Sequence, residues 1–151
     1  MSPEQKTLVQ ETWRHVVPIA DTAASLFYER LFEVDPKIRD LFEGVDLAGQ
    51  GAKLTQAINM VVGALDRLDD LSPVVAALGR RHAGYGVTDA HYDTVGAALI
   101  WTLEKGLGDL WSEDAKSAWL AAYTVLAGIM KSAAADIDDT RTARHASSMT
   151  A

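Results

Sequence analysis

Apolar residues recur at helical spacing along most of the chain. The clearest case is the stretch 47–68, where six apolar side chains fall on one stripe: Leu47, Leu54, Ile58, Val61, Leu65 and Leu68. Similar stripes run through residues 8–17, 26–32, 74–78, 92–103 and 119–130. No stretch of useful length alternates between apolar and polar residues, as a half-buried strand would. The pattern therefore predicts an all-α fold.

Capping residues divide this pattern into helices. Ser2 is followed by Pro3 and, three positions on, by Gln5, which completes a capping box. The same reasoning places further helix starts near Asp21, near Leu47, at Ser72-Pro73, at Thr88 and at Ser112, and helix ends at Pro36, Gly84, Gly86, Gly106 and Gly108. Residues 36–42 are expected to form a short turn, and the stripe of 47–68 a single helix.

Length and composition limit the class of protein. The 151 residues are enough for one domain with its own core, which we expect over residues 1–135. Residues 136–151 are polar and poor in large apolar side chains, and are expected to form a disordered tail. The net charge of −7 argues against nucleic acid as a partner.

The chain has no cysteine, which excludes disulfides, thiolate metal sites and covalent haem attachment. The N-terminus lacks the pattern of a secretory signal, and the longest apolar stretch, residues 119–130, is too short to span a bilayer. A cytoplasmic protein without a membrane partner is therefore expected.

His82 lies on the apolar face of a predicted helix, close to the end of that helix. It follows Leu78 by four positions and Val75 by seven, and these offsets place all three on one face. Taken alone, a histidine in such a stripe is most often a packing residue with a hydrogen-bond partner.

The neighbours of His82 favour a second interpretation. Arg80 and Arg81 place positive charge at the rim, and Gly84 and Gly86 allow the backbone to approach a bulky group closely. A flat, dianionic and mostly apolar ligand suits this combination, with the imidazole as its axial ligand; haem is such a ligand. The alternative is that the two arginines lie on an ordinary solvated helix face.

Two polar residues on the earlier predicted helices also favour a bound ligand. Gln50 shares a helix face with Leu47, Leu54 and Ile58, and a glutamine among leucines is costly to bury without a partner. Tyr28 is another polar group on an apolar stripe. Taken separately, Gln50 could reach solvent and Tyr28 could be an ordinary core aromatic.

Together these residues resemble the globin family. The segments FYERLF, DP, LF, Q with KL, GRRH, YGV, HYDTVGAAL and AWLAAYTVLAG follow one another in the family's order across about residues 4–131. The pattern is most similar to bacterial single-domain globins and to the globin domain of flavohaemoglobins. The resemblance implies a three-on-three helical sandwich around haem b.

The resemblance also implies roles for individual residues. His82 resembles the proximal iron ligand, and Phe42 the phenylalanine that packs flat on the porphyrin. Tyr28 and Gln50 resemble the distal pair that holds dioxygen by hydrogen bonds, and Leu54 the residue that limits the distal pocket. The implied propionate partners are Arg81 and Lys53, and the remaining implied cofactor contacts are Ile58, Leu78, Val87, Tyr92, Val95 and Leu99.

The chain departs from the flavohaemoglobin pattern in two places. The glutamate of that family's proximal network falls on Ala134, so the ring N–H of His82 is expected to bond a backbone carbonyl near Leu78 instead. The loop between Phe42 and Gln50 is short by family standards, which leaves the distal register open. No flavin or nicotinamide domain is expected, so turnover would need an external electron donor.

These roles imply tight, reversible binding of dioxygen, with nitric oxide and carbon monoxide as further ligands. Such binding suits oxygen scavenging or storage, or detoxification of nitric oxide. Three alternatives remain open at this point. They are a nitric oxide dioxygenase that works with a separate reductase, a haem-based gas sensor, and a haem-free helical interaction protein.

Overall fold

The computed structural model describes the backbone of residues 1–150 and the side chains of residues 1–135, and over this range it consists of helices without strands. The α-helices are α1 (Pro3–Val16), α2 (Ala20–Val34), α3 (Leu47–Gly63), α4 (Leu68–Gly84), α5 (Asp89–Leu107) and α6 (Glu113–Thr150). Short 3₁₀ helices lie between them: η1 (Val17–Ile19), η2 (Pro36–Phe42), η3 (Leu65–Arg67) and η4 (Gly108–Leu110). The predicted tail, residues 136–151, lies outside the residues whose side chains are described.

The predicted capping residues begin their helices. The Gln5 backbone N–H donates to Ser2 Oγ at 3.1 Å, and the Ser2 N–H donates to Gln5 Oε1 at 3.0 Å, so the capping box is confirmed. Ser112 Oγ accepts from the Ala115 N–H at 3.0 Å at the start of α6. The predicted turn over residues 36–42 is the 3₁₀ helix η2.

The predicted boundary between the third and fourth helices is wrong by several residues. The apolar stripe continues to Leu68, but α3 ends at Gly63, and α4 begins at Leu68 rather than at Ser72. The buried side chain of Leu65 anchors a 3₁₀ turn in the core and bends the chain there. Pro73 therefore lies inside α4, in its second turn, and not at the first helical position.

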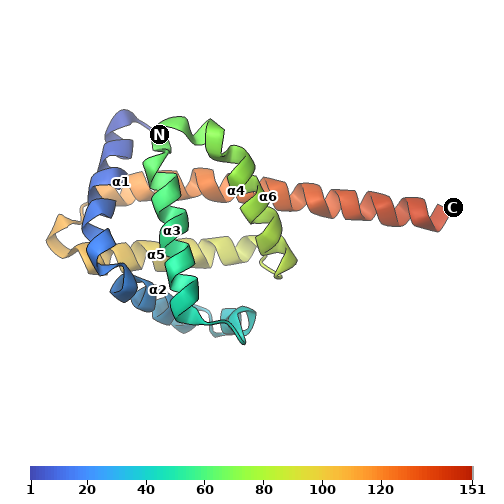
Figure 1. The fold of residues 1–151 in the computed structure, drawn as a ribbon, viewed down its shortest axis with the longest axis horizontal. Coiled ribbons are helices and arrows are strands. Elements are labelled where there is room, and N and C mark those ends of the chain that lie inside the picture. Colours follow the sequence, from blue (N-terminus) through green and yellow to red (C-terminus); the bar gives the residue numbers. More distant parts are fainter. Residues whose placement is uncertain (151) are drawn as a thin grey trace.

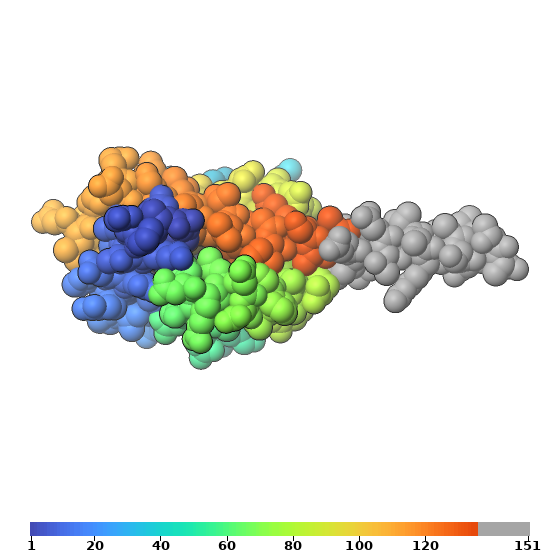
Figure 2. Space-filling view, turned by 90° about the horizontal axis from the view of Figure 1, so that it is seen from above, coloured from blue at the N-terminus to red at the C-terminus, as the bar shows by residue number. Residues whose placement is uncertain are grey.

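The helices form two crossed layers. Figure 1 shows α1, α3 and α4 passing in front of α5 and α6, with α2 beside α5. In Figure 2, α1 (blue) and α4 (green) lie against α6 (orange). Helix α3 packs on α2 and α1, whereas α4 packs on α6, and α3 and α4 make no extended contact with each other.

One core cluster joins α1 to α3, α5 and α6. Its largest members are Trp13 and Trp119, whose ring centroids lie 6.0 Å apart. The Trp13 indole donates to Asn59 Oδ1 at 2.5 Å, and the Trp119 indole donates to Thr12 Oγ1 at 2.9 Å. Each buried indole N–H therefore has a partner, and both tryptophans act as packing residues of this core.

Two helix crossings depend on glycine. A Cβ on Gly79 of α4 would lie 2.5 Å from the Met130 carbonyl oxygen of α6, so only glycine allows this close approach. A Cβ on Gly51 of α3 would lie 2.9 Å from the Ala24 Cβ of α2. These contacts fix how α4 lies on α6 and how α3 lies on α2.

Residues Glu113–Ala135 of α6 are long and apolar enough to cross a membrane. In this structure the segment packs against α4, α1 and α5, and Ala118, Trp119 and Met130 are buried there. The apolar character of α6 is therefore explained by its central place in the fold.

Candidate functional site

His82 lies in the last turn of α4, and its side chain is half-buried. Its Nδ1 lies 2.8 Å from the Leu78 carbonyl oxygen, and because a carbonyl only accepts, Nδ1 carries the proton. The predicted bond to a carbonyl near Leu78 is confirmed. The bond fixes the ring and leaves the Nε2 lone pair of a neutral imidazole for another partner.

The turn after α4 keeps the backbone close to this histidine. The Val87 N–H donates to the His82 carbonyl at 3.1 Å, and Gly86 has a φ of +92°, which lies in the left-handed region that favours glycine. The predicted end of the helix at Gly84 and Gly86 is confirmed. Leu41 of η2 reaches this turn, since its Cδ2 would lie 3.7 Å from a Cβ on Gly86.

Tyr28 lies in α2 with only 6% of its surface exposed. Its ring centroid is 5.5 Å from that of Phe42 in an edge contact and 6.2 Å from that of Phe32 in a stacked one. Burial raises the pKa of Tyr28 from 10.0 to about 12, so its hydroxyl stays protonated near neutral pH. The group is thus a neutral hydrogen-bond donor inside an aromatic cluster.

Gln50 is half-buried in the first turn of α3. The neighbouring Gly51 lies against Ala24 and against Cε2 of Tyr28, at 3.9 Å from its would-be Cβ. This crossing sets the register of α3 against α2, with Gln50 directly before the contact. Sequence reasoning singled out neither Gly51 nor Ala24, although two small residues on facing helices were the signal available.

The predicted apolar contacts fall into neighbouring clusters. Phe42, Leu54, Val95 and Leu99 pack in the cluster of Tyr28, between α2, α3 and α5. Leu78 and Val87 pack with Tyr92 between α4, α5 and α6, and Ile58 joins Leu99 at the edge of the larger core. Apart from Tyr28 and Tyr92, which are buried, these side chains are half-buried.

The two predicted cationic partners lie at the surface. Lys53 is exposed on α3 and Arg81 is exposed on α4. Within the side chains that the structure describes, neither of them joins a salt bridge. Both charges are therefore available to an anionic group at the rim.

Tyr92 is buried in α5, with 7% of its surface exposed, and its hydroxyl has no hydrogen-bond partner among the described residues. Burial, with a smaller contribution from Asp89, raises the pKa of this hydroxyl. Tyr123 does not reach the Tyr92 hydroxyl, because it donates to the Tyr92 carbonyl at 2.5 Å. Position 134 carries alanine, so no carboxylate is supplied from there.

The other histidine of this region has a structural task. His91 is half-buried, and its Nδ1 accepts from the Thr88 N–H at 2.9 Å. It thereby caps the start of α5. His91 is thus committed to the helix terminus.

The donor set fits a planar cofactor better than a metal ion held by protein alone. Among the described side chains, no three His, Cys, Asp or Glu groups come together as metal ligands. His82 supplies one oriented imidazole, and most of the apolar residues predicted to contact the cofactor are half-buried, on elements that include α3 and α4, which make no extended contact with each other. An apolar macrocycle with a central iron and anionic edges matches these residues.

Known proteins are similar to this chain in sequence and in the arrangement of helices. A family model described as Globin matches residues 25–130. Leghemoglobin from Psophocarpus tetragonolobus is 33% identical over 141 residues, which are 86% of this chain and 95% of that protein. Anaerobic nitrite reductase NSHB5 from Oryza sativa subsp. indica is 29% identical over 135 residues, 86% of this chain and 93% of that protein.

Two further similarities concern a longer relative and a solved structure. Flavohemoprotein from Bacillus subtilis (strain 168) is 29% identical over 130 residues, which are 82% of this chain but only 32% of that protein. The structure of an engineered carbene transferase from Rhodothermus marinus has a TM-score of 0.83 at 24% identity, covering 94% of this chain and 99% of that chain. This likeness confirms the three-on-three helical fold predicted from the sequence.

Proposed function

The chain belongs to the globin family, and we propose that it holds haem b through His82 and binds dioxygen tightly with Tyr28 and Gln50. Proteins of this family bind haem and handle diatomic gases. When bound, the cofactor supplies an iron centre with one coordination position open to a gas. The protein supplies the surroundings of that position.

His82 is the residue that would hold the iron. Its Nδ1–H donates to the Leu78 carbonyl, and this bond orients the ring. The lone pair of Nε2 is then left to coordinate the iron. This hydrogen bond is the observation that carries the proposal. Because its acceptor is a carbonyl and not a carboxylate, the imidazole receives less electron density than in a carboxylate-linked pair, which favours binding of a gas over peroxidase chemistry.

Tyr28 and Gln50 would act on the gas. The buried Tyr28 hydroxyl and the Gln50 amide are both neutral donors, and a dioxygen molecule that gains partial negative charge accepts hydrogen bonds from them. Each bond contributes about 1–3 kcal/mol, so the pair slows dissociation by about 10²-fold or more. Lys53 and Arg81 would pair with the cofactor's carboxylates from the two sides of the rim.

The visible spectrum of the purified, haem-reconstituted protein tests this proposal. We expect a Soret band, and changes in that band when the reduced protein meets air and then carbon monoxide. A colourless protein that takes up no haem would overturn the proposal and would favour a haem-free helical interaction protein.

A second candidate is a nitric oxide dioxygenase that works with a separate reductase. The similarity to the Bacillus subtilis flavohemoprotein favours it, and the chain spans about a third of that protein. Rapid mixing of the reduced, air-equilibrated protein with nitric oxide, with and without a flavin reductase, distinguishes the candidates. Repeated consumption of nitric oxide only when the reductase is present would establish the enzyme. A single consumption followed by permanent ferric protein would favour oxygen binding alone.

A further inference from the structure

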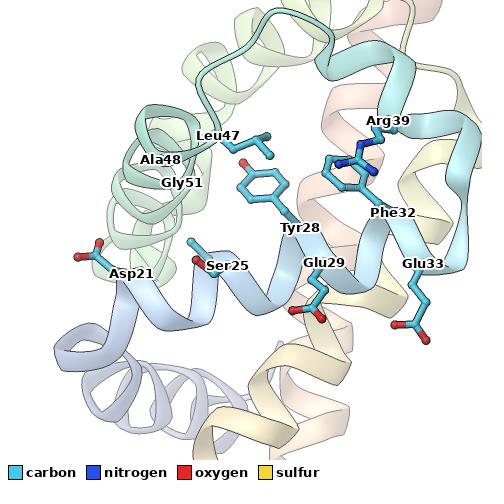
Figure 3. A pocket seen from close by; sticks show the side chains of 11 residues that line it. Asp21, Ser25, Tyr28, Glu29, Phe32, Glu33, Arg39, Leu47, Ala48 and Gly51 are labelled. Carbon is cyan, nitrogen blue, oxygen red and sulfur yellow. The ribbon is translucent and has the colours of Figure 1, made fainter.

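A cleft of about 920 Å³ lies between α2, η2 and the start of α3. Figure 3 shows Tyr28 standing between the two helices, with Leu47, Ala48 and Gly51 on the α3 side. Neither His82 nor the apolar residues of α4 line this cleft. It is therefore a separate space that approaches Tyr28 from the surface.

Tyr28 is the wall between this cleft and the candidate site. It lines the cleft, and it also packs in the cluster that contains Phe42 and Leu54. Beside it, the Gly51 backbone packs against Ala24, so the wall here consists of the α2–α3 contact and the Tyr28 ring. The ring is the part of this wall that can move, and none of the described residues holds its hydroxyl by a hydrogen bond, so rotation of the ring breaks no such bond.

The chemistry of the cleft selects what can pass. Its inner part is apolar and is formed by small or aliphatic side chains such as Ala24 and Leu47. Its outer edge is lined by Asp21, Glu29 and Glu33, of which Glu33 pairs with Arg30 at 3.3 Å, and by one cation among the lining residues. That cation, Arg39, lies over the Phe32 ring at 5.3 Å from its centroid. Such an edge offers no cluster of cations that would hold an anion, and it does not hinder a small neutral molecule.

We propose that this cleft is the route by which small neutral diatomic gases reach and leave the candidate site, with the Tyr28 ring as its gate. The inference rests on the proposed function, because it concerns the ligands of that same site. The competing route is the surface beside Gln50 and Lys53 on α3.

Filling the cleft tests the route. Ala48 is exposed and lines the cleft, so Ala48→Trp fills it without disturbing the core. Ala52→Trp is the matched control, since Ala52 is exposed on the same helix one turn later and does not line the cleft. After flash photolysis of the haem-reconstituted protein, the association rate of carbon monoxide is expected to fall by about tenfold in Ala48→Trp and to be unchanged in Ala52→Trp.

A route and a binding contact leave different signatures. Residues along a route do not contact the gas once it is bound. Blocking the route therefore slows association and dissociation by the same factor and leaves the affinity unchanged. Loss of a contact instead changes the affinity. The dissociation rate of carbon monoxide, measured by displacement with nitric oxide, is therefore expected to fall in parallel in Ala48→Trp.

The absence of cysteine allows a reversible test from the opposite wall. Ser25 is exposed and lines the cleft on α2, so Ser25→Cys places a single thiol there. Attachment of methyl and then benzyl groups through methanethiosulfonate reagents is expected to slow carbon monoxide association progressively. Reduction of the mixed disulfide is expected to restore the original rate, which shows that the protein stayed folded throughout.

The outcomes separate the two proposals. A normal Soret band with unchanged association in Ala48→Trp and in benzylated Ser25→Cys refutes the route and leaves haem binding intact. A lower association rate with an unaltered dissociation rate also refutes it, because the site itself has then been disturbed. Failure of the unmodified protein to take up haem refutes the proposed function.

Discussion

Tyr28→Phe removes one hydroxyl and leaves a ring of the same shape. The contacts of that ring with Phe42 and Phe27, at centroid distances of 5.5 and 5.1 Å, do not involve the oxygen. The substitution therefore removes the hydrogen bond that Tyr28 would donate to dioxygen without creating a cavity. Loss of one hydrogen bond to a partly charged acceptor costs about 1.5 kcal/mol or more, which corresponds to about tenfold faster dissociation of dioxygen.

Stopped-flow displacement of dioxygen by excess carbon monoxide measures this rate. Carbon monoxide itself is the control ligand, because it carries little charge when bound and gains little from a hydrogen-bond donor. Its dissociation rate is expected to change by less than about twofold, which is less than about 0.4 kcal/mol. The two ligands together separate a lost hydrogen bond from a general change in the pocket.

The stability of Tyr28→Phe gives an independent check. Since no hydrogen bond to the Tyr28 hydroxyl is found among the described residues, its removal leaves no partner unsatisfied, and the free energy of unfolding is not expected to fall. A variant that binds haem normally, is as stable as the wild type and releases dioxygen at the wild-type rate would remove Tyr28 from the distal role.

Three further predictions follow from the same geometry. His82→Gly is expected to lose the Soret band at its normal position, and added imidazole is expected to restore it; retention of the unchanged spectrum without imidazole would show that His82 is not the ligand. Burial raises the pKa of Tyr28 from 10.0 to about 12, so its contribution to stability is fully present below pH 10 and is lost as the pH rises to about 12. Over this range the free energy of unfolding, measured with urea, is expected to fall by about 3 kcal/mol in the wild type, and Tyr28→Phe is expected not to show this loss. An equal alkaline loss in both proteins would contradict this assignment. Gly79→Ala is expected to destabilise the protein by about 2–4 kcal/mol because its methyl group meets the Met130 backbone. Gly128→Ala, with open space around it, should be neutral or stabilising by up to about 1 kcal/mol. Thermal unfolding of the two variants measures the difference, and equal stability would refute the close α4–α6 contact.

Local sequence signals located most of the secondary structure and the proximal part of the site. Capping at Ser2 and Ser112 and the helix end at Gly84 and Gly86 depend on residues within a few positions of each other, and all are found as predicted. The bond from His82 to the Leu78 carbonyl is of the same kind, because both residues belong to one turn of one helix. The order of motifs identified the family because it constrains the whole chain at once.

Tertiary structure decided the features that depend on contacts distant in sequence. The break at Gly63, five residues before the apolar stripe ends, follows from the burial of Leu65 in a core built by other helices. The register of Gln50 comes from the contact of Gly51 with Ala24, and the cleft behind Tyr28 exists only where α2 meets α3. A sequence pattern reports which face of a helix is apolar, since that is a property of the helix alone. The packing of whole helices decides which residue of the partner helix each side chain contacts. At a close crossing such as that of α2 and α3, a single glycine decides how near the two helices can lie.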